Sequence, residues 1–126
     1  MYQLPLVVIV EPEWPTRSYL RAELRELGYE VLAFETAEEA ERSLEHWGFQ
    51  PSLLVLDLSR SGSEATGVAQ LLARFPDTPL LVIASPLRAL PQHVQRRVTR
   101  LLRRPASVHE LVQAIRELVP PPFIVR

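Results

Sequence analysis

The stretch Ser52-Leu53-Leu54-Val55-Leu56-Asp57 predicts a buried strand that ends in a single carboxylate. It follows Pro51, has no alternation of apolar and polar residues, and leads into a polar segment at residues 59–63. Such a run is typical of a strand that is covered on both faces in a parallel sheet. In open parallel sheets, ligands bind beyond the carboxyl ends of the strands. Asp57 is therefore the first candidate for a functional residue.

Four further short apolar runs predict strands, and segments with helical periodicity separate them. These strands are predicted at residues 6–10, 29–34, 79–84 and 101–103. Alternating strands and helices with right-handed crossovers give an α/β fold, a flavodoxin-like, doubly wound, five-stranded parallel sheet of order 2-1-3-4-5 with helices on both faces. The first and third strands are neighbours in this order. Glu11 and Glu13, which follow the first strand, should therefore converge with Asp57 on one crevice.

Local signals mark the predicted helices. Two capping boxes indicate helix starts, Thr36 with Glu39 and Ser107 with Glu110. Apolar spacing predicts the buried face of the second helix, which consists of Ala37, Ala40, Leu44 and Trp47. Gly48 should end that helix. Because Pro86 and Pro91 interrupt the fourth helical segment, only a short helix over residues 91–97 is expected there.

Length and composition limit the class of protein. The 126 residues suffice for one domain, which we place at residues 1–119, followed at 120–126 by a proline-rich tail or the start of a linker. The chain has no cysteine, which excludes disulfides, thiol catalysis and thiolate zinc sites. No apolar run is long enough to span a membrane, and the amino terminus lacks the pattern of a signal peptide. We therefore expect a cytoplasmic protein.

Several of these segments together resemble a known family. They are Val8-Ile9-Val10-Glu11-Pro12-Glu13, Leu54-Val55-Leu56-Asp57, Pro79-Leu80-Leu81-Val82-Ile83-Ala84-Ser85, and Arg104-Pro105 before the capped last helix. From about Leu6 to Val119 the chain resembles the receiver domain of two-component response regulators, of the chemotaxis-regulator type. The resemblance implies a phosphorelay switch, not an enzyme, in which Asp57 accepts a phosphoryl group from a histidine kinase.

The resemblance also implies a Mg²⁺ site, because a carboxylate attacks a dianionic phosphoryl group only when a cation offsets the charge. The acidic pair of the family's first strand maps to Glu11 and Pro12. Proline has no side-chain oxygen, so the usual direct ligand is missing, and Glu13 could replace it only by reaching back. We therefore expect weak Mg²⁺ binding by Glu11, Glu13 and Asp57.

The other working positions of the family are altered as well. The hydroxyl position maps to Ala84, with Ser85 one residue late and thus on the opposite side of the strand. The lysine position maps to Arg104, a planar fork that could pair with Asp57. The aromatic switch position maps to Leu101. The sequence thus predicts an atypical receiver domain, with phosphorylation of Asp57 impaired or lost and protein docking retained.

Charge distribution suggests where a partner would dock. Residues 1–47 carry ten acids and four arginines, and residues 48–126 carry five acids and ten arginines. A cluster on the predicted fourth helix and fifth strand forms the candidate partner face, Arg96, Arg97, Arg100 and Arg103. The resemblance implies a histidine kinase, an output domain or another receiver as partner, including a homodimer through the fourth helix, fifth strand and fifth helix. A dedicated nucleic-acid binder is disfavoured by the acidic first half and a pI near 6.3.

One alternative function of another class is compatible with the same fold. A small flavodoxin-like domain could use the acidic crevice to bind a metal ion or a phosphorylated ligand, or to act as an enzyme. No catalytic base or phosphate-binding loop accompanies the acids in the sequence. The receiver reading therefore remains the preferred hypothesis.

Overall fold

A single parallel sheet organises the chain. The computed structural model describes residues 4–59 and 65–122. Its five strands are β1 Leu6–Val10, β2 Glu30–Phe34, β3 Leu53–Asp57, β4 Leu80–Ala84 and β5 Arg100–Arg103. They are arranged in the order β2-β1-β3-β4-β5, and every neighbouring pair is parallel. The predicted flavodoxin-like sheet of order 2-1-3-4-5 is confirmed.

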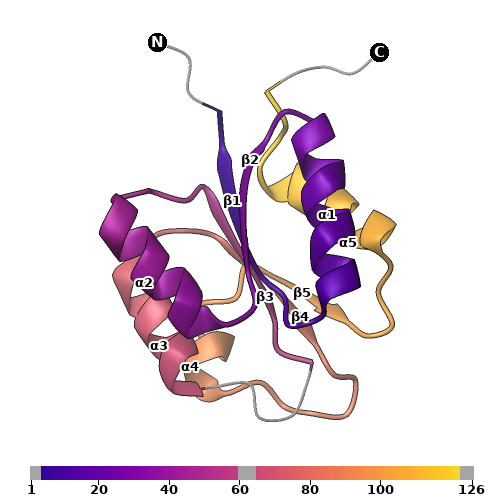
Figure 1. Cartoon of the computed structure of the whole chain (residues 1–126). Coiled ribbons are helices and arrows are strands. Elements are labelled where there is room, and N and C mark those ends of the chain that lie inside the picture. Colours follow the sequence, from indigo (N-terminus) through magenta and orange to yellow (C-terminus); the bar gives the residue numbers. More distant parts are fainter. Residues whose placement is uncertain (1–3, 60–64, 123–126) are drawn as a thin grey trace.

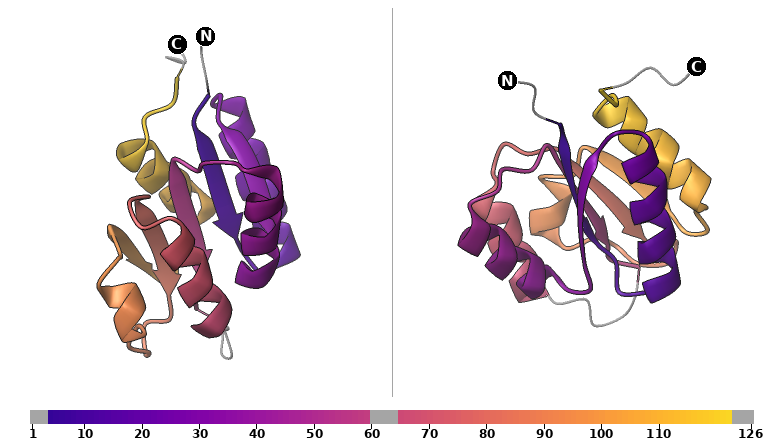
Figure 2. Two further views of the ribbon diagram at one scale, coloured as in Figure 1. Left: turned by 90° about the vertical axis from the view of Figure 1, so that its left-hand side faces the viewer. Right: turned by 45° about the horizontal axis from the view of Figure 1, so that its top comes forward.

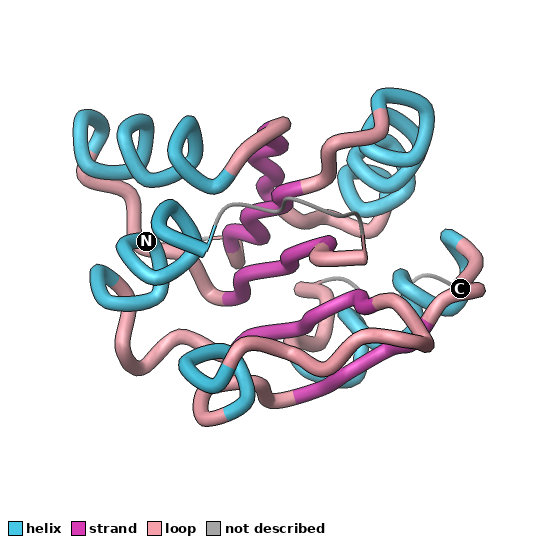
Figure 3. Tube along the Cα trace, turned by 90° about the horizontal axis from the view of Figure 1, so that it is seen from below, coloured by secondary structure: helices cyan, strands magenta, loops and turns pink. Residues whose placement is uncertain are grey.

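Helices cover both faces of the sheet (Figure 1). One face carries α1 Trp14–Glu26 and α5 Val108–Leu118, and the other carries α2 Ala37–Trp47, α3 Ala65–Arg74 and α4 Gln92–Gln95. Viewed from the carboxyl ends of the strands, the sheet lies between the two helical layers (Figure 3). Since every residue of β3 and β4 is buried, these two strands have no polar alternation in their sequence.

The local helix signals hold in the structure. The Thr36 hydroxyl accepts a hydrogen bond from the Glu39 backbone N–H at 3.1 Å, and the Ser107 hydroxyl accepts one from the Glu110 N–H at 3.1 Å. Gly48 ends α2 with a φ of 70°, a left-handed conformation that glycine adopts without steric cost. The predicted helix starts at Thr36 and Ser107 and the predicted end of α2 are thus confirmed, with both hydroxyls acting as caps.

Two local predictions need correction. The fourth helix is a single turn, Gln92–Gln95, and is shorter than the predicted 91–97. The chain has to turn there because Thr99 already joins the sheet, where its backbone N–H donates to the Leu80 carbonyl at 2.8 Å. Trp47 was assigned to the buried face of α2, but its residue surface is 65% exposed and its ring stacks on Phe49.

The direction of the strands places all candidate acids at one edge. The strands run the same way (Figure 2), and Val10 lies opposite Leu56 in the β1–β3 register, so Glu11 and Asp57 follow at neighbouring positions. Within the described ranges, no helix is long and apolar enough to cross a membrane. Of the predicted tail at 120–126, residues 123–126 lie outside the described part of the chain.

Candidate functional site

Asp57 and Glu11 form the centre of the candidate site. Asp57 is 3% exposed at the carboxyl end of β3, and Glu11 is 2% exposed directly after β1. The β1–β3 register places the two acids at neighbouring positions, and each shifts the pKa of the other. The predicted convergence of these two acids is therefore observed, and both are more deeply buried than surface acids would be.

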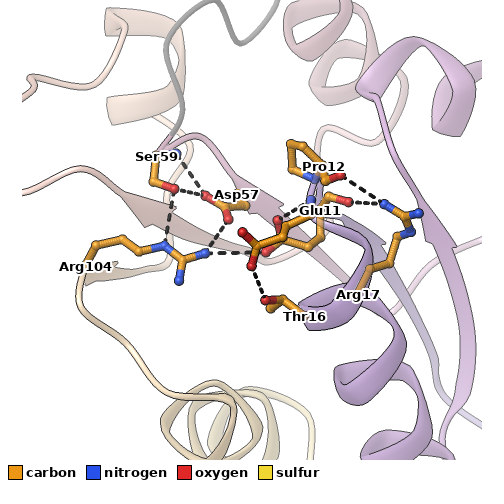
Figure 4. A network of polar contacts seen from close by, with 8 residues as sticks. Glu11, Pro12, Thr16, Arg17, Asp57, Ser59 and Arg104 are labelled. Carbon is orange, nitrogen blue, oxygen red and sulfur yellow. Dashed lines mark hydrogen bonds and ion pairs between the residues drawn. The ribbon is translucent and has the colours of Figure 1, made fainter.

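Arg104 completes this centre from the segment between β5 and α5 (Figure 4). Its Nη2 lies 2.6 Å from Asp57 Oδ2 and 3.5 Å from Glu11 Oε1. Its backbone N–H donates to the Ala84 carbonyl at 2.9 Å, which fixes the start of the side chain at the end of the sheet. The ion pair with Asp57 that the sequence suggested is present, and one guanidinium spans both acids.

Ser59 is a member of the site that sequence reasoning missed. Its backbone N–H donates to Asp57 Oδ1 at 2.9 Å, its hydroxyl donates to the same oxygen, and this hydroxyl accepts a bond from Arg104 Nε at 3.2 Å. An aspartate in a loop commonly accepts a hydrogen bond from the backbone N–H two residues on, and this spacing was the available signal. The hydroxyl at Asp57 thus comes from the β3–α3 loop.

The segment after β1 is held by contacts of its own. Arg17 Nη1 donates to the Glu11 carbonyl at 2.7 Å and to the Pro12 carbonyl at 3.3 Å. Thr16 donates its hydroxyl proton to Glu13 Oε1 at 2.8 Å, and the Glu13 N–H donates to Glu11 Oε2 at 3.1 Å. These bonds tie the side chain of Glu13 to the first turn of α1.

Burial and the neighbouring groups give the two acids different protonation. Burial first, and then the hydrogen bond with Asp57, raise the pKa of Glu11 to about 8. Burial alone would raise the pKa of Asp57 too, but hydrogen bonds from Glu11, Ser59 and Arg104 lower it below its usual value. Burial opposes the charge of Arg104, but Asp57 raises the pKa of the guanidinium. At neutral pH the centre thus holds a protonated Glu11, an ionised Asp57 and a charged Arg104.

This arrangement does not fit a Mg²⁺ ion. Each of the four carboxyl oxygens already has a partner. Asp57 Oδ1 accepts from Ser59, and Glu11 Oε2 accepts from the Glu13 N–H. Asp57 Oδ2 and Glu11 Oε1 both face the Arg104 guanidinium. Mg²⁺ requires oxygen ligands in near-octahedral geometry, and a protonated Glu11 is a poor one. Across residues 4–59 and 65–122, no group of three or more acidic or histidine side chains could hold a metal ion.

The positions that correspond to the receiver family's hydroxyl and aromatic residues contribute no polar group to the centre. Ala84 is 1% exposed and belongs to the core on the α2–α3–α4 face, and Leu101 packs against the same core. The Ser85 hydroxyl accepts a bond from the Leu87 N–H at 3.2 Å, within the loop after β4. This contact gives Ser85 a role within that loop.

The arginines of the candidate partner face have different roles. Arg97 differs from the prediction, because its guanidinium donates to the carbonyls of Leu72, Phe75 and Thr78 at 2.7–3.1 Å and so holds the end of α3. Arg103 is exposed and donates to two loop carbonyls, and Arg100 forms an ion pair with Glu117 at 3.4 Å. Arg96 is exposed, and its side chain makes no ion pair or hydrogen bond within the described residues.

Comparison with known proteins identifies the fold. No family model matches the sequence, and no curated protein does either. A response regulator receiver domain protein from Clostridium thermocellum is similar in structure, with a TM-score of 0.74 and 16% identity over 92% of this chain and 94% of that one. A response regulator receiver protein from Burkholderia phymatum has a TM-score of 0.72 and 20% identity over 94% and 99% of the two chains.

The chemotaxis protein CheY4 of Vibrio cholerae gives the same result. Its TM-score is 0.74 and its identity 17%, over 93% of this chain and all of that one. These alignments extend over nearly the full length of both partners, so the whole sheet and its helical layers correspond. The chain therefore has the fold of response regulator receiver domains.

Proposed function

We propose that this chain is a receiver-type docking module of two-component signal transduction that works without phosphorylation of Asp57. The receiver fold and the position of Asp57 at the carboxyl end of the central strand support the signalling class. The ion pair between Arg104 and Asp57 is the single observation that supports a function without phosphorylation. It gives Asp57 a permanent charged partner inside the protein.

Phosphorylation would require Asp57 to attack a phosphoryl donor with a free oxygen. Both of its oxygens are already bonded, and the residue is 3% exposed, so a donor reaches it only after Arg104 moves. Ala84 adds no hydroxyl to stabilise the phosphoryl oxygens. Each missing electrostatic group of this kind typically costs about 3 kcal/mol of transition-state stabilisation. We therefore expect slow or absent phosphorylation.

Docking is assigned to the exposed surface around α4, β5 and α5. Three of the four predicted arginines remain available for it, namely Arg96, Arg100 and Arg103, because Arg97 is used inside the fold. Leu87, at 92% exposure in the loop before α4, adds an apolar residue to the region. A protein with an acidic surface would suit this face, whether a histidine kinase, an output domain or a second receiver, including a second copy.

The direct test is exposure of the chain to acetyl phosphate and millimolar Mg²⁺, followed by intact mass spectrometry. We expect no adduct of one phosphoryl group within an hour, and the Asp57→Ala variant serves as the blank. Stoichiometric phosphorylation of wild type that is absent from Asp57→Ala would refute a phosphorylation-independent function. The alternative of a metal-binding or phospholigand-binding domain gains no support from carboxyl oxygens that are all bonded.

A further inference from the structure

The space between two converging carboxyl groups is where a dissociable cation is expected, and in this chain a side chain fills it. Arg104 Nη2 is within ion-pair distance of Asp57 and Glu11 at once, and both carboxyl side chains are at most 2% exposed. A guanidinium is always charged and has donors but no acceptor, so it cannot ligate a metal ion and repels one at these oxygens. The two kinds of cation exclude each other.

Arg104 is also held in this place from several directions. The backbone N–H is bonded to the end of β4, Nε donates to the Ser59 hydroxyl, and Nη2 meets the two acids. A cation that belongs to the chain is present at a fixed position whatever the concentration of ions outside. A divalent ion would have to displace it and break these bonds before gaining its own ligands.

We propose that Arg104 is the permanent cation of this pocket and excludes divalent ions from it, so that removing the guanidinium converts Glu11 and Asp57 into a divalent-cation site. This inference deepens the proposed function and rests on it for the biological meaning of a closed pocket. Its physical basis, the arrangement of Arg104, Asp57 and Glu11, is independent of any partner.

The test is a Mn²⁺ titration in which electron paramagnetic resonance reports the free ion. Four proteins are compared: wild type, Arg104→Ala, Arg104→Lys and the double variant Arg104→Ala/Asp57→Asn. Arg96→Ala, which removes an exposed arginine, is the matched control. Arg104→Lys keeps a positive charge for folding but cannot span both acids as a fork. Urea unfolding of each variant, with and without Mn²⁺, shows which are folded and which are stabilised by the ion.

We expect Arg104→Ala to bind one Mn²⁺ with at least roughly tenfold higher affinity than wild type, and Arg104→Lys to fall between them. The double variant and Arg96→Ala should bind no better than wild type. Wild type that binds Mn²⁺ as tightly as Arg104→Ala overturns the inference. Folded Arg104→Ala and Arg104→Lys proteins that gain no affinity overturn it as well. The Mn²⁺ titration involves no partner protein and no phosphodonor. A failure to find docking would therefore contradict the proposed function but would leave the result of this titration unaffected.

Discussion

Replacing Arg104 by methionine should destabilise the protein strongly, although the side chain lies at the edge of the structure. At a separation of 2.6 Å, the attraction between Arg104 and Asp57 is about 6 kcal/mol for an effective dielectric constant of about 20. The Arg104 side chain is 32% exposed, so water screens part of this energy, and dehydration of Asp57 cancels more. Removing one partner of such a pair leaves the other buried without compensation, which costs about 3 kcal/mol.

Urea unfolding followed by circular dichroism measures this loss. For a slope of about 2 kcal/mol per molar urea, a loss of about 3 kcal/mol lowers the midpoint by about 1.5 M. The double variant Arg104→Met/Asp57→Asn removes both charges and should recover most of the loss, to within about 1 kcal/mol of wild type. Arg96→Met, which changes an exposed arginine, should leave the midpoint within experimental error.

Two results would show that the ion pair does not have this role. One is a loss below about 0.5 kcal/mol for Arg104→Met, which is the range of an exposed surface pair. The other is a double variant whose loss equals the sum of the losses measured for Arg104→Met and for Asp57→Asn alone, because coupling between the residues would then be absent.

Three further predictions concern other parts of the structure. Because the folded-state pKa of Glu11 is raised to about 8, its contribution to stability is complete below pH 4.5 and is lost as the pH rises to 8. The urea midpoint of wild type should therefore fall between pH 5 and 8, and Glu11→Gln should flatten this fall. The control Glu35→Gln, at an exposed site, should leave the fall unchanged. Arg97→Ala should cost about 2 kcal/mol in urea unfolding, because three carbonyls at the end of α3 lose their donor, and Arg96→Ala should cost almost nothing. Changing Arg96, Arg100 and Arg103 together to Glu should abolish binding to a purified partner, as measured by calorimetry. Asp57→Ala should bind this partner as wild type does. The reverse pattern would mean that the phosphorylation site governs docking.

The alternation of buried strands and capped helices was sufficient to predict the sheet and its strand order. Uninterrupted apolar runs such as Leu53–Leu56 require cover on both faces, and parallel connections of this length allow few topologies. The same logic placed Glu11 and Asp57 at one edge, because residues that follow neighbouring parallel strands must emerge together. The capping boxes at Thr36 and Ser107 were predictable since their hydrogen bonds are local in sequence.

Side-chain direction was decided only by the tertiary structure. Arg97 and Arg96 are adjacent and chemically alike, but only Arg97 faces the carbonyls at the end of α3, so one holds the fold and the other is exposed. Trp47 continues the apolar spacing of α2, but it is the last residue of that helix, and its ring stacks on the exposed Phe49 and stays largely uncovered. Periodicity predicts which side of a helix a side chain lies on, but it does not predict whether a neighbouring element extends far enough to cover that side chain.

The state of the candidate site also depended on contacts that are distant in sequence. Arg104 and Asp57 are 47 positions apart, and a loop serine completes their network. From the sequence, Arg104 could be an exposed arginine or a partner of Asp57, because a long side chain has many rotamers. Burial of the ionised Asp57 beside it makes the paired rotamer the favourable one, since a buried charge requires a partner. The sequence by itself determined which groups meet at this edge, and only the packing around them decided that a guanidinium joins them.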